Sequence, residues 1–140
     1  METSQVDATP VVDRLLVPAV RVSLGLLFVW FGVLKVSGDS PVVELVAATL
    51  PWADAGLLLP LLGWFEIVLG GALIVGWPRR LALLATVGHL AGTFLAFVQA
   101  PSLMMSGGNP FLLTAAGEFV MKNAVLVCVA LLLLRLCDRP

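Results

Sequence analysis

Charge is scarce in this 140-residue chain: 12% of its residues are charged, 60% are hydrophobic, and its mean hydropathy is +1.06. A typical soluble domain carries about 25% charged and about 45–50% apolar residues. The shortage of charge therefore predicts an integral membrane protein with little room for a separate soluble domain. The net charge of −1 gives no reason to expect nucleic acid as a partner.

Cysteine and histidine are also rare. The two cysteines, Cys128 and Cys137, form no Cys-x-x-Cys motif. On one helix their spacing places them on opposite faces and roughly 13 Å apart along the axis, which excludes a disulfide between them. The single histidine, His89, would need a second chain to form a bis-histidine haem, and a metal site would need carboxylates to complete it. We therefore expect no metal.

Four apolar runs predict the fold. They cover about 15–36, 57–76, 81–98 and 117–136. Each is close to the roughly 20 residues that a helix needs to cross a bilayer. The start of the chain is acidic, unlike the basic start of a signal peptide, so the first run is interpreted as a retained span. The expectation is an all-α, four-transmembrane-helix bundle that forms one domain over 1–140.

The connections contain two further apolar segments. Residues 42–50, between Pro41 and Pro51, are too few to span and predict a short helix at the membrane interface, with Trp52 as an anchor. The loop between the third and fourth spans contains Met104 and Met105, which are more typical of packing than of a soft-metal site.

Four spans place both termini on one side, and the basic residues indicate which side. Lys35 and Lys122 fall on the side opposite the termini. The arginines fall on the side of the termini: Arg14, Arg21, Arg79, Arg80, Arg135 and Arg139. This bias predicts cytoplasmic termini in a multi-pass protein of a bacterial plasma membrane.

One face of the first span is unlike its lipid-compatible surroundings. At about 100° per residue, it collects two cations, two glycines and an aromatic ring. These are Arg21, Gly25, Phe28, Gly32 and Lys35. The glycines predict close helix packing, as do Gly63, Gly70 and Gly92 in the next two spans. Arg21 is either part of a site or a side chain that extends to the lipid headgroups.

Glu66 and His89 lie near the middle of the second and third spans. A carboxylate at this depth costs a few kcal/mol unless it is neutral or paired. Glu66 is therefore either a ligand-binding or proton-accepting acid, or the structural bond that locks the bundle. His89 lies on a small-residue face. It could contact haem iron or a quinone carbonyl, or it could be a core histidine bonded to Glu66 or to a backbone carbonyl.

Glu118 and Lys122 are four residues apart at the outer end of the fourth span, a spacing that suits a helical ion pair. They are either an ordinary pair at a helix start or part of a site. Lys35 is expected at the same depth. The three side chains would then form an outer polar ring above Glu66 and His89.

Several motifs resemble a known family. The first span reads Arg-x-x-x-Gly-x-x-Phe-x-Trp-Phe-Gly-x-x-Lys, and the second contains Glu66-x-x-x-Gly70. Gly-Thr-Phe-Leu-Ala-Phe-Val-Gln-Ala-Pro occupies 92–101, and Gly-Glu-Phe-Val-Met-Lys-Asn occupies 117–123. Their order and spacing resemble the DoxX-like membrane proteins, and within them the YkgB-like branch.

The resemblance implies a four-helix membrane bundle and a set of family-type positions. These are Arg21, Gly25, Gly32, Lys35, Glu66 and Lys122. The founding DoxX proteins are associated with a thiosulfate:quinone oxidoreductase, and relatives with oxidative or electrophile stress. The chain departs from the family pattern after the third span, where Gln99-Ala100-Pro101 replaces an expected Thr-Thr-Pro sequence.

Three functions remain open, and whether the chain is an enzyme is not decided. The first hypothesis is an accessory subunit of a larger membrane complex, or a homo-oligomer, because the chain is small and has no metal or nucleotide motif. The second is a quinone-binding component of a membrane oxidoreductase. The third is a small proton-coupled transporter, suggested by the same intramembrane charges.

Overall fold

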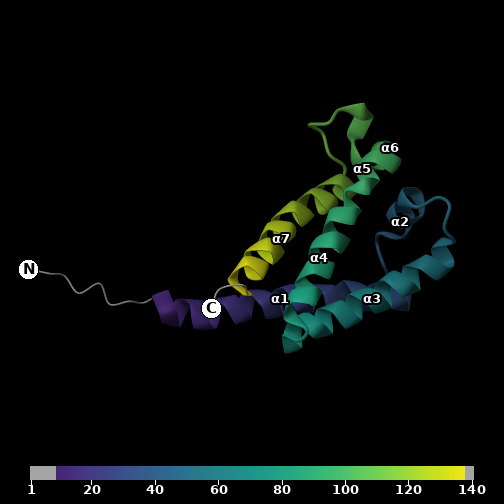
Figure 1. Ribbon diagram of the computed structural model, residues 1–140. Helices are drawn as coiled ribbons and strands as arrows, with labels where there is room; N and C mark the ends of the chain where they lie inside the picture. Colours follow the sequence, from purple (N-terminus) through teal and green to yellow (C-terminus); the bar gives the residue numbers. More distant parts are fainter. Residues whose placement is uncertain (1–8, 138–140) are drawn as a thin grey trace, which may run out of the picture.

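The computed structural model describes residues 9–137, which are almost entirely helical (Figure 1). The helices are α1 (Thr9–Ser37), α2 (Val43–Thr49), α3 (Ala55–Val75), α4 (Arg79–Thr93), α5 (Leu95–Gln99), α6 (Pro101–Met104), the short 3₁₀ helix η1 (Ser106–Gly108) and α7 (Ala115–Cys137). Within this part of the chain the only extended pairing is an isolated bridge between Met105 and Leu113. The all-α expectation is confirmed.

Four segments are long and apolar enough to span a membrane: Asp13–Ser37, Ala55–Val75, Arg79–Gln99 and Ala115–Cys137. They agree with the four expected spans to within a few residues at each end. The third span is less regular than expected because it consists of α4 and α5, separated at Phe94. There the backbone N–H of Phe94 bonds to the carbonyls of Ala91 and Gly92.

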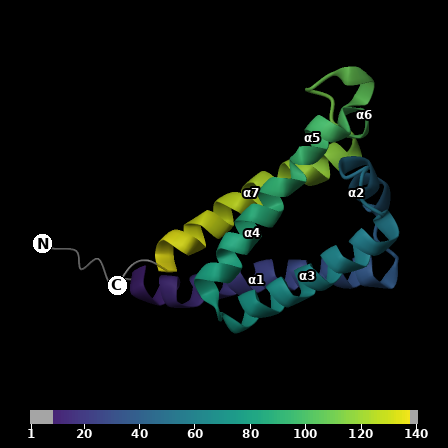
Figure 2. The same cartoon turned by 45° about the vertical axis from the view of Figure 1, so that its right-hand side comes forward.

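The spans form two antiparallel pairs, α1 with α3 and α4 with α7 (Figures 1 and 2). In both views the pairs meet near the turn between α3 and α4 and diverge toward the other end of the molecule. The short helix α2 lies at this open end, where it packs on α5 and α3. The predicted short helix therefore exists, and it packs against the spans.

Facing glycines bring α1 and α3 into backbone contact. An ideal Cβ on Gly70 would lie 2.5 Å from the carbonyl oxygen of Gly25, and one on Gly32 would lie 2.5 Å from that of Gly63. Real Cβ atoms do not approach oxygen this closely, so these positions require glycine. The expectation for Gly92 is wrong: a Cβ there would meet nothing within 4 Å. Gly92 is exposed, and α4 diverges from α3 with distance from the turn that joins them (Figure 2).

Arg21 closes the other end of the α1–α3 pair. Its Nη1 donates to the carbonyl oxygens of Leu73, at 2.5 Å, and Ile74, at 3.4 Å, in the last turn of α3. A cation at a helix C-terminus is favoured by the helix dipole and satisfies carbonyls that have no partner within the helix. Gly76 then ends α3 in the left-handed conformation, with φ +80°. This bond gives Arg21 a role in joining α1 to α3, and a contact with the lipid headgroups stays a prediction.

Buried apolar side chains form two clusters at different heights in the bundle. The larger, here called the closed-end core, contains Leu24, Phe28, Leu69, Leu73, Ala82, Leu83, Leu90, Ala130 and Leu133, from all four spans. The smaller, the open-end cluster, contains Ala96, Met104 and Val120. Met104 is fully buried there, as expected for a packing methionine. Between the clusters the diverging helices leave space for a site.

The glycine contacts predict a position-specific cost of adding one methyl group to α3. Gly70→Ala should destabilise the protein by about 1–3 kcal/mol, because the new Cβ meets the backbone of α1, which cannot move without separating the helices. Gly71→Ala is the matched control, since a Cβ there meets nothing within 4 Å. Thermal unfolding in detergent micelles measures both. Equal melting temperatures for the two variants would contradict the assigned packing.

Candidate functional site

Three ionisable side chains from three different helices meet inside the bundle. Lys35 Nζ of α1 lies 2.7 Å from Glu66 Oε2 of α3, and His89 Nε2 of α4 lies 2.8 Å from Glu66 Oε1. The exposed fractions of the side chains are 10% for Lys35, 7% for Glu66 and 16% for His89. Each carboxylate oxygen therefore has its own partner, and Glu66 links two helices to α3.

The same glycines that bring α1 and α3 together place Lys35 beside Glu66. A Cβ on Gly63 would lie 2.9 Å from the Cβ of Lys35, so the lysine stem passes where a larger residue would stand. Lys35 is in the last turn of α1, where the helix dipole favours a cation. From there its ammonium extends to Glu66, one turn along α3 from Gly63.

The network satisfies Glu66 and leaves hydrogen-bonding capacity on its partners. An ionised carboxylate only accepts hydrogen bonds, so His89 Nε2 carries the hydrogen in this arrangement. Among the described residues, His89 Nδ1 has no hydrogen-bond partner, and Lys35 Nζ has only Glu66. An ammonium group has three donors, so two remain for a ligand.

Aromatic rings surround the network. The ring of His89 lies between Phe28 and Phe65, with centroids 5.7 Å and 5.4 Å away. Phe31 lies 6.0 Å from Lys35 Nζ and makes an edge contact with Phe119 of α7 at 5.7 Å. These rings place apolar groups beside the charged ones, and a less polar environment strengthens the electrostatic attraction between the charges.

Beside the network lies a cavity of about 370 Å³, between the closed-end core and the open-end cluster. Small-molecule sites are typically about 300–1,000 Å³, apolar, and supplied with a few polar groups. Lys35, Glu66 and His89 all line this cavity. Helix α2 contributes Leu45, Val46 and Thr49 to it, and Val42 precedes the helix as its N-cap, so the short helix also forms one of its walls.

Sequence analysis missed the second polar contact in the cavity, between Thr93 and Asn123. Asn123 Nδ2 of α7 donates to Thr93 Oγ1 of α4 at 3.0 Å, and the hydroxyl donates in turn to the carbonyl of Leu90. Both residues line the cavity, and Asn123 is 7% exposed. The available signal was a polar amide inside an apolar span, where such groups bond across helices.

Glu118 and Lys122 lie apart from this site. Both are exposed on α7, and within the described residues they form no ion pair with each other or with Lys35. The expected outer ring is not formed, because Lys35 extends to Glu66. Arg21 belongs to the closed end, as described above. Cys128 and Cys137 are free thiols. Among residues 9–137, no three His, Cys, Asp or Glu side chains gather as metal ligands would.

Comparison with protein families identifies the relatives of this arrangement. The DoxX family model matches residues 16–99, which include Lys35, Glu66 and His89. The chain belongs to the DoxX family. The match ends before α7, and assignment to the YkgB-like branch stays a prediction. No curated protein and no solved structure matches this DoxX family chain.

The ion pair predicts strong coupling between Lys35 and Glu66. Lys35→Met should lower the free energy of unfolding by about 3–5 kcal/mol, because it leaves the Glu66 carboxylate buried without its cation. The double variant Lys35→Met/Glu66→Leu should recover much of that loss, since both charges are removed. Denaturation of the two single variants and the double variant gives the coupling energy. Additive losses would contradict a direct interaction.

Proposed function

We propose that this DoxX family membrane protein binds a lipid-soluble quinone, as the quinone-binding component of a membrane oxidoreductase. The observation that carries the proposal is the apolar cavity of about 370 Å³ with the Lys35–Glu66–His89 network on its wall. A quinone headgroup is flat, apolar at its faces and polar at its two carbonyl oxygens. The cavity offers phenylalanine rings for the faces and the ammonium donors of Lys35 for the oxygens.

The residues also suit the protons of quinone chemistry. Reduction of a quinone to a quinol takes up two electrons and two protons. His89 lies at the cavity wall with Nδ1 free of other described partners, so once it is protonated it can pass that proton to a bound carbonyl, while the Glu66 carboxylate stabilises the imidazolium. Lys35 stabilises negative charge that develops on the same oxygen. The electrons are assigned to a partner subunit, so the accessory-subunit hypothesis is retained as part of this proposal.

The transporter hypothesis has less support. A proton-coupled transporter needs a route for its substrate from one side of the membrane to the other. The closed-end core fills the bundle between the cavity and the turn that joins α3 to α4. Lys35 and His89 both bond to Glu66, which connects three helices and favours a static binding wall over a moving gate.

The placement in a bacterial plasma membrane with cytoplasmic termini remains our proposal. The described arginines support it, because they lie in the first half of α1, around the α3–α4 turn and at the end of α7. These segments lie toward the same end of the molecule in Figure 2. Arg139 lies outside the described residues. In this orientation the quinone cavity occupies the outer half of the membrane.

The proposal predicts quinone bound to the gently solubilised protein, detected by lipid extraction and mass spectrometry. Added short-chain quinone should bind saturably. His89→Ala should weaken its binding by about 10–100-fold, the equivalent of one hydrogen bond to a charged or polarised group. Lys35→Met should weaken binding to a similar extent. Lys122→Met is the matched control, because it removes a lysine that is exposed and outside the cavity.

A second variant separates ligand binding from stability. Val46→Phe on α2 adds volume to the cavity and leaves Lys35, Glu66 and His89 unchanged. It should abolish quinone binding while the melting temperature of the ligand-free protein stays near that of the wild type. Absence of saturable binding to the folded wild-type protein would overturn the proposal, as would undiminished binding to folded Val46→Phe.

A further inference from the structure

Two glycines of α4, Gly88 and Gly92, are among the residues that line the cavity. We propose that a quinone enters and holds its tail through a lateral opening between α3 and α4, across Gly88 and Gly92. The inference rests on the proposed function and deepens it, because it assigns the ligand class: a headgroup that carries a long apolar tail. The glycines support this inference only because they border a cavity with charged side chains on its wall.

Gly88 and Gly92 have the properties expected of residues that border a lateral opening. Both line the cavity, both are exposed, and both lie on α4, one helical turn apart. An ideal Cβ on either glycine would meet nothing within 4 Å. The glycines of the α1–α3 contact differ, because the backbone of the neighbouring helix fills the space where their side chains would be. At Gly88 and Gly92 the missing side chains leave open space between the cavity and the surroundings.

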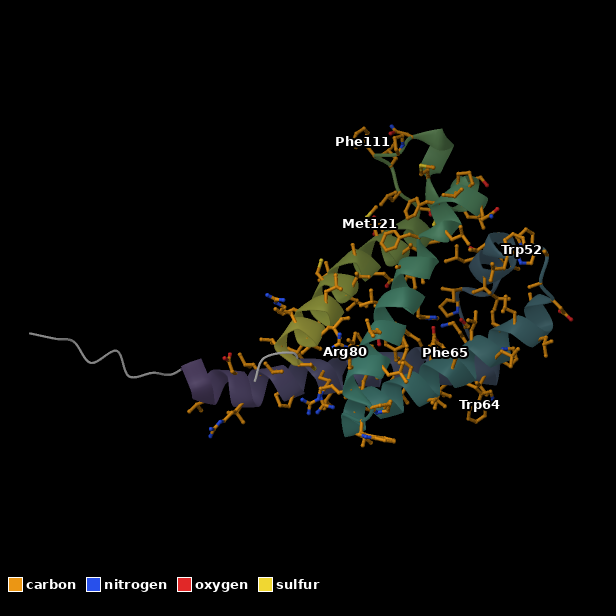
Figure 3. All side chains as sticks on the ribbon, viewed as in Figure 1. Trp52, Trp64, Phe65, Arg80, Phe111 and Met121 are labelled. Atoms are coloured by element: carbon orange, nitrogen blue, oxygen red, sulfur yellow. The ribbon has the colours of Figure 1, made fainter. Side chains whose placement is uncertain are left out.

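The opening has identifiable edges. Toward the α3–α4 turn it is bounded by Phe65 of α3, which contacts the ring of His89 at 5.4 Å. Leu62 of α3 and Gly92 of α4 also line the cavity, and both lie about one helical turn farther from the α3–α4 connection than Phe65 and His89 do. From there α3 and α4 continue to diverge (Figure 2), and α2 covers the far end. Figure 3 shows the neighbouring Trp64 pointing outward from α3, away from this opening.

The other sides offer no comparable exit. Between α1 and α7, Phe31 and Phe119 meet edge to face at 5.7 Å. Toward the α3–α4 turn, the closed-end core fills the bundle. At the open end, α2 packs on α5 and contributes Leu45 and Thr49 to the cavity wall. The α3–α4 side is therefore the side on which glycines, and not bulky side chains, border the cavity.

The size of the cavity explains why an exit is needed. About 370 Å³ lies near the lower end of the range for small-molecule sites, about 300–1,000 Å³, and suits a headgroup. A tail of several isoprenoid units has no room beside it. The outward faces of α3 and α4 carry exposed apolar side chains such as Val68 and Leu84, which the lipid contacts. A tail that leaves across Gly92 would join that lipid.

The test uses the double variant Gly88→Leu/Gly92→Leu and two quinones with the same headgroup, one with a long isoprenoid tail and one with a methyl group in its place. Gly71→Leu on α3 is the matched control, because a Cβ there also meets open space but Gly71 does not line the cavity. Affinities are measured in detergent micelles, and melting temperatures confirm that each variant is folded. The double variant should weaken binding of the long-tailed quinone at least about tenfold more than it weakens binding of the tail-less quinone.

The outcomes separate this inference from the proposed function. If the wild type binds neither quinone, the proposed function itself fails. If the wild type binds both and the double variant also binds both unchanged, the quinone site stands and the lateral opening is wrong. Equal loss of both quinones in a folded double variant would also overturn the opening, because the leucines would then be blocking the headgroup site. Loss of the long-tailed quinone in Gly71→Leu would show that the effect is not specific to the opening.

Discussion

A carboxylate inside an apolar bundle needs partners, and the rest of this structure is arranged around the two partners of Glu66. Lys35 supplies the opposite charge and His89 a second hydrogen bond, so both oxygens are satisfied. The three residues come from α1, α3 and α4, so one acidic side chain connects three spans. Without that arrangement, the cost of burying a charge would oppose the fold.

The backbone geometry makes this arrangement possible. Four glycines let the backbones of α1 and α3 come into direct contact, which brings Lys35 within reach of Glu66. They are Gly25, Gly32, Gly63 and Gly70. The α4–α7 pair has no equivalent glycine contact with α1 and α3, and it diverges from them beyond the closed-end core. Close packing in one place and divergence in another produce a cavity with a charged wall and apolar sides. This combination of features favours a ligand site over a purely structural ion pair, because two donors of Lys35 and Nδ1 of His89 have no partner among residues 9–137.

Glu118 and Lys122 show why sequence spacing alone misplaced part of the site. Their four-residue separation and the expected depth of Lys35 suggested one polar ring. The flexible four-carbon stem of Lys35 reaches Glu66, and no helical periodicity specifies that choice. The prediction of close packing at Gly92 was wrong for a related reason. A glycine in a span is compatible with close packing and with open space, and only the position of the neighbouring helix distinguishes the two. Arg21 and Asn123 gained their roles from partners 52 and 30 residues away in the chain.

The sequence by itself determined the membrane environment, the four spans and the inward face of α1. It also determined that Glu66 and His89 lie inside the bundle. These follow from composition, helical periodicity and the cost of a buried charge, which are local properties of the chain. The pairing of Lys35 with Glu66, the contact between Thr93 and Asn123, the cavity and its glycine-bordered opening were decided by the tertiary structure. Each depends on how far apart two helices lie and at what height they meet, and that is set by packing between segments that are distant in sequence.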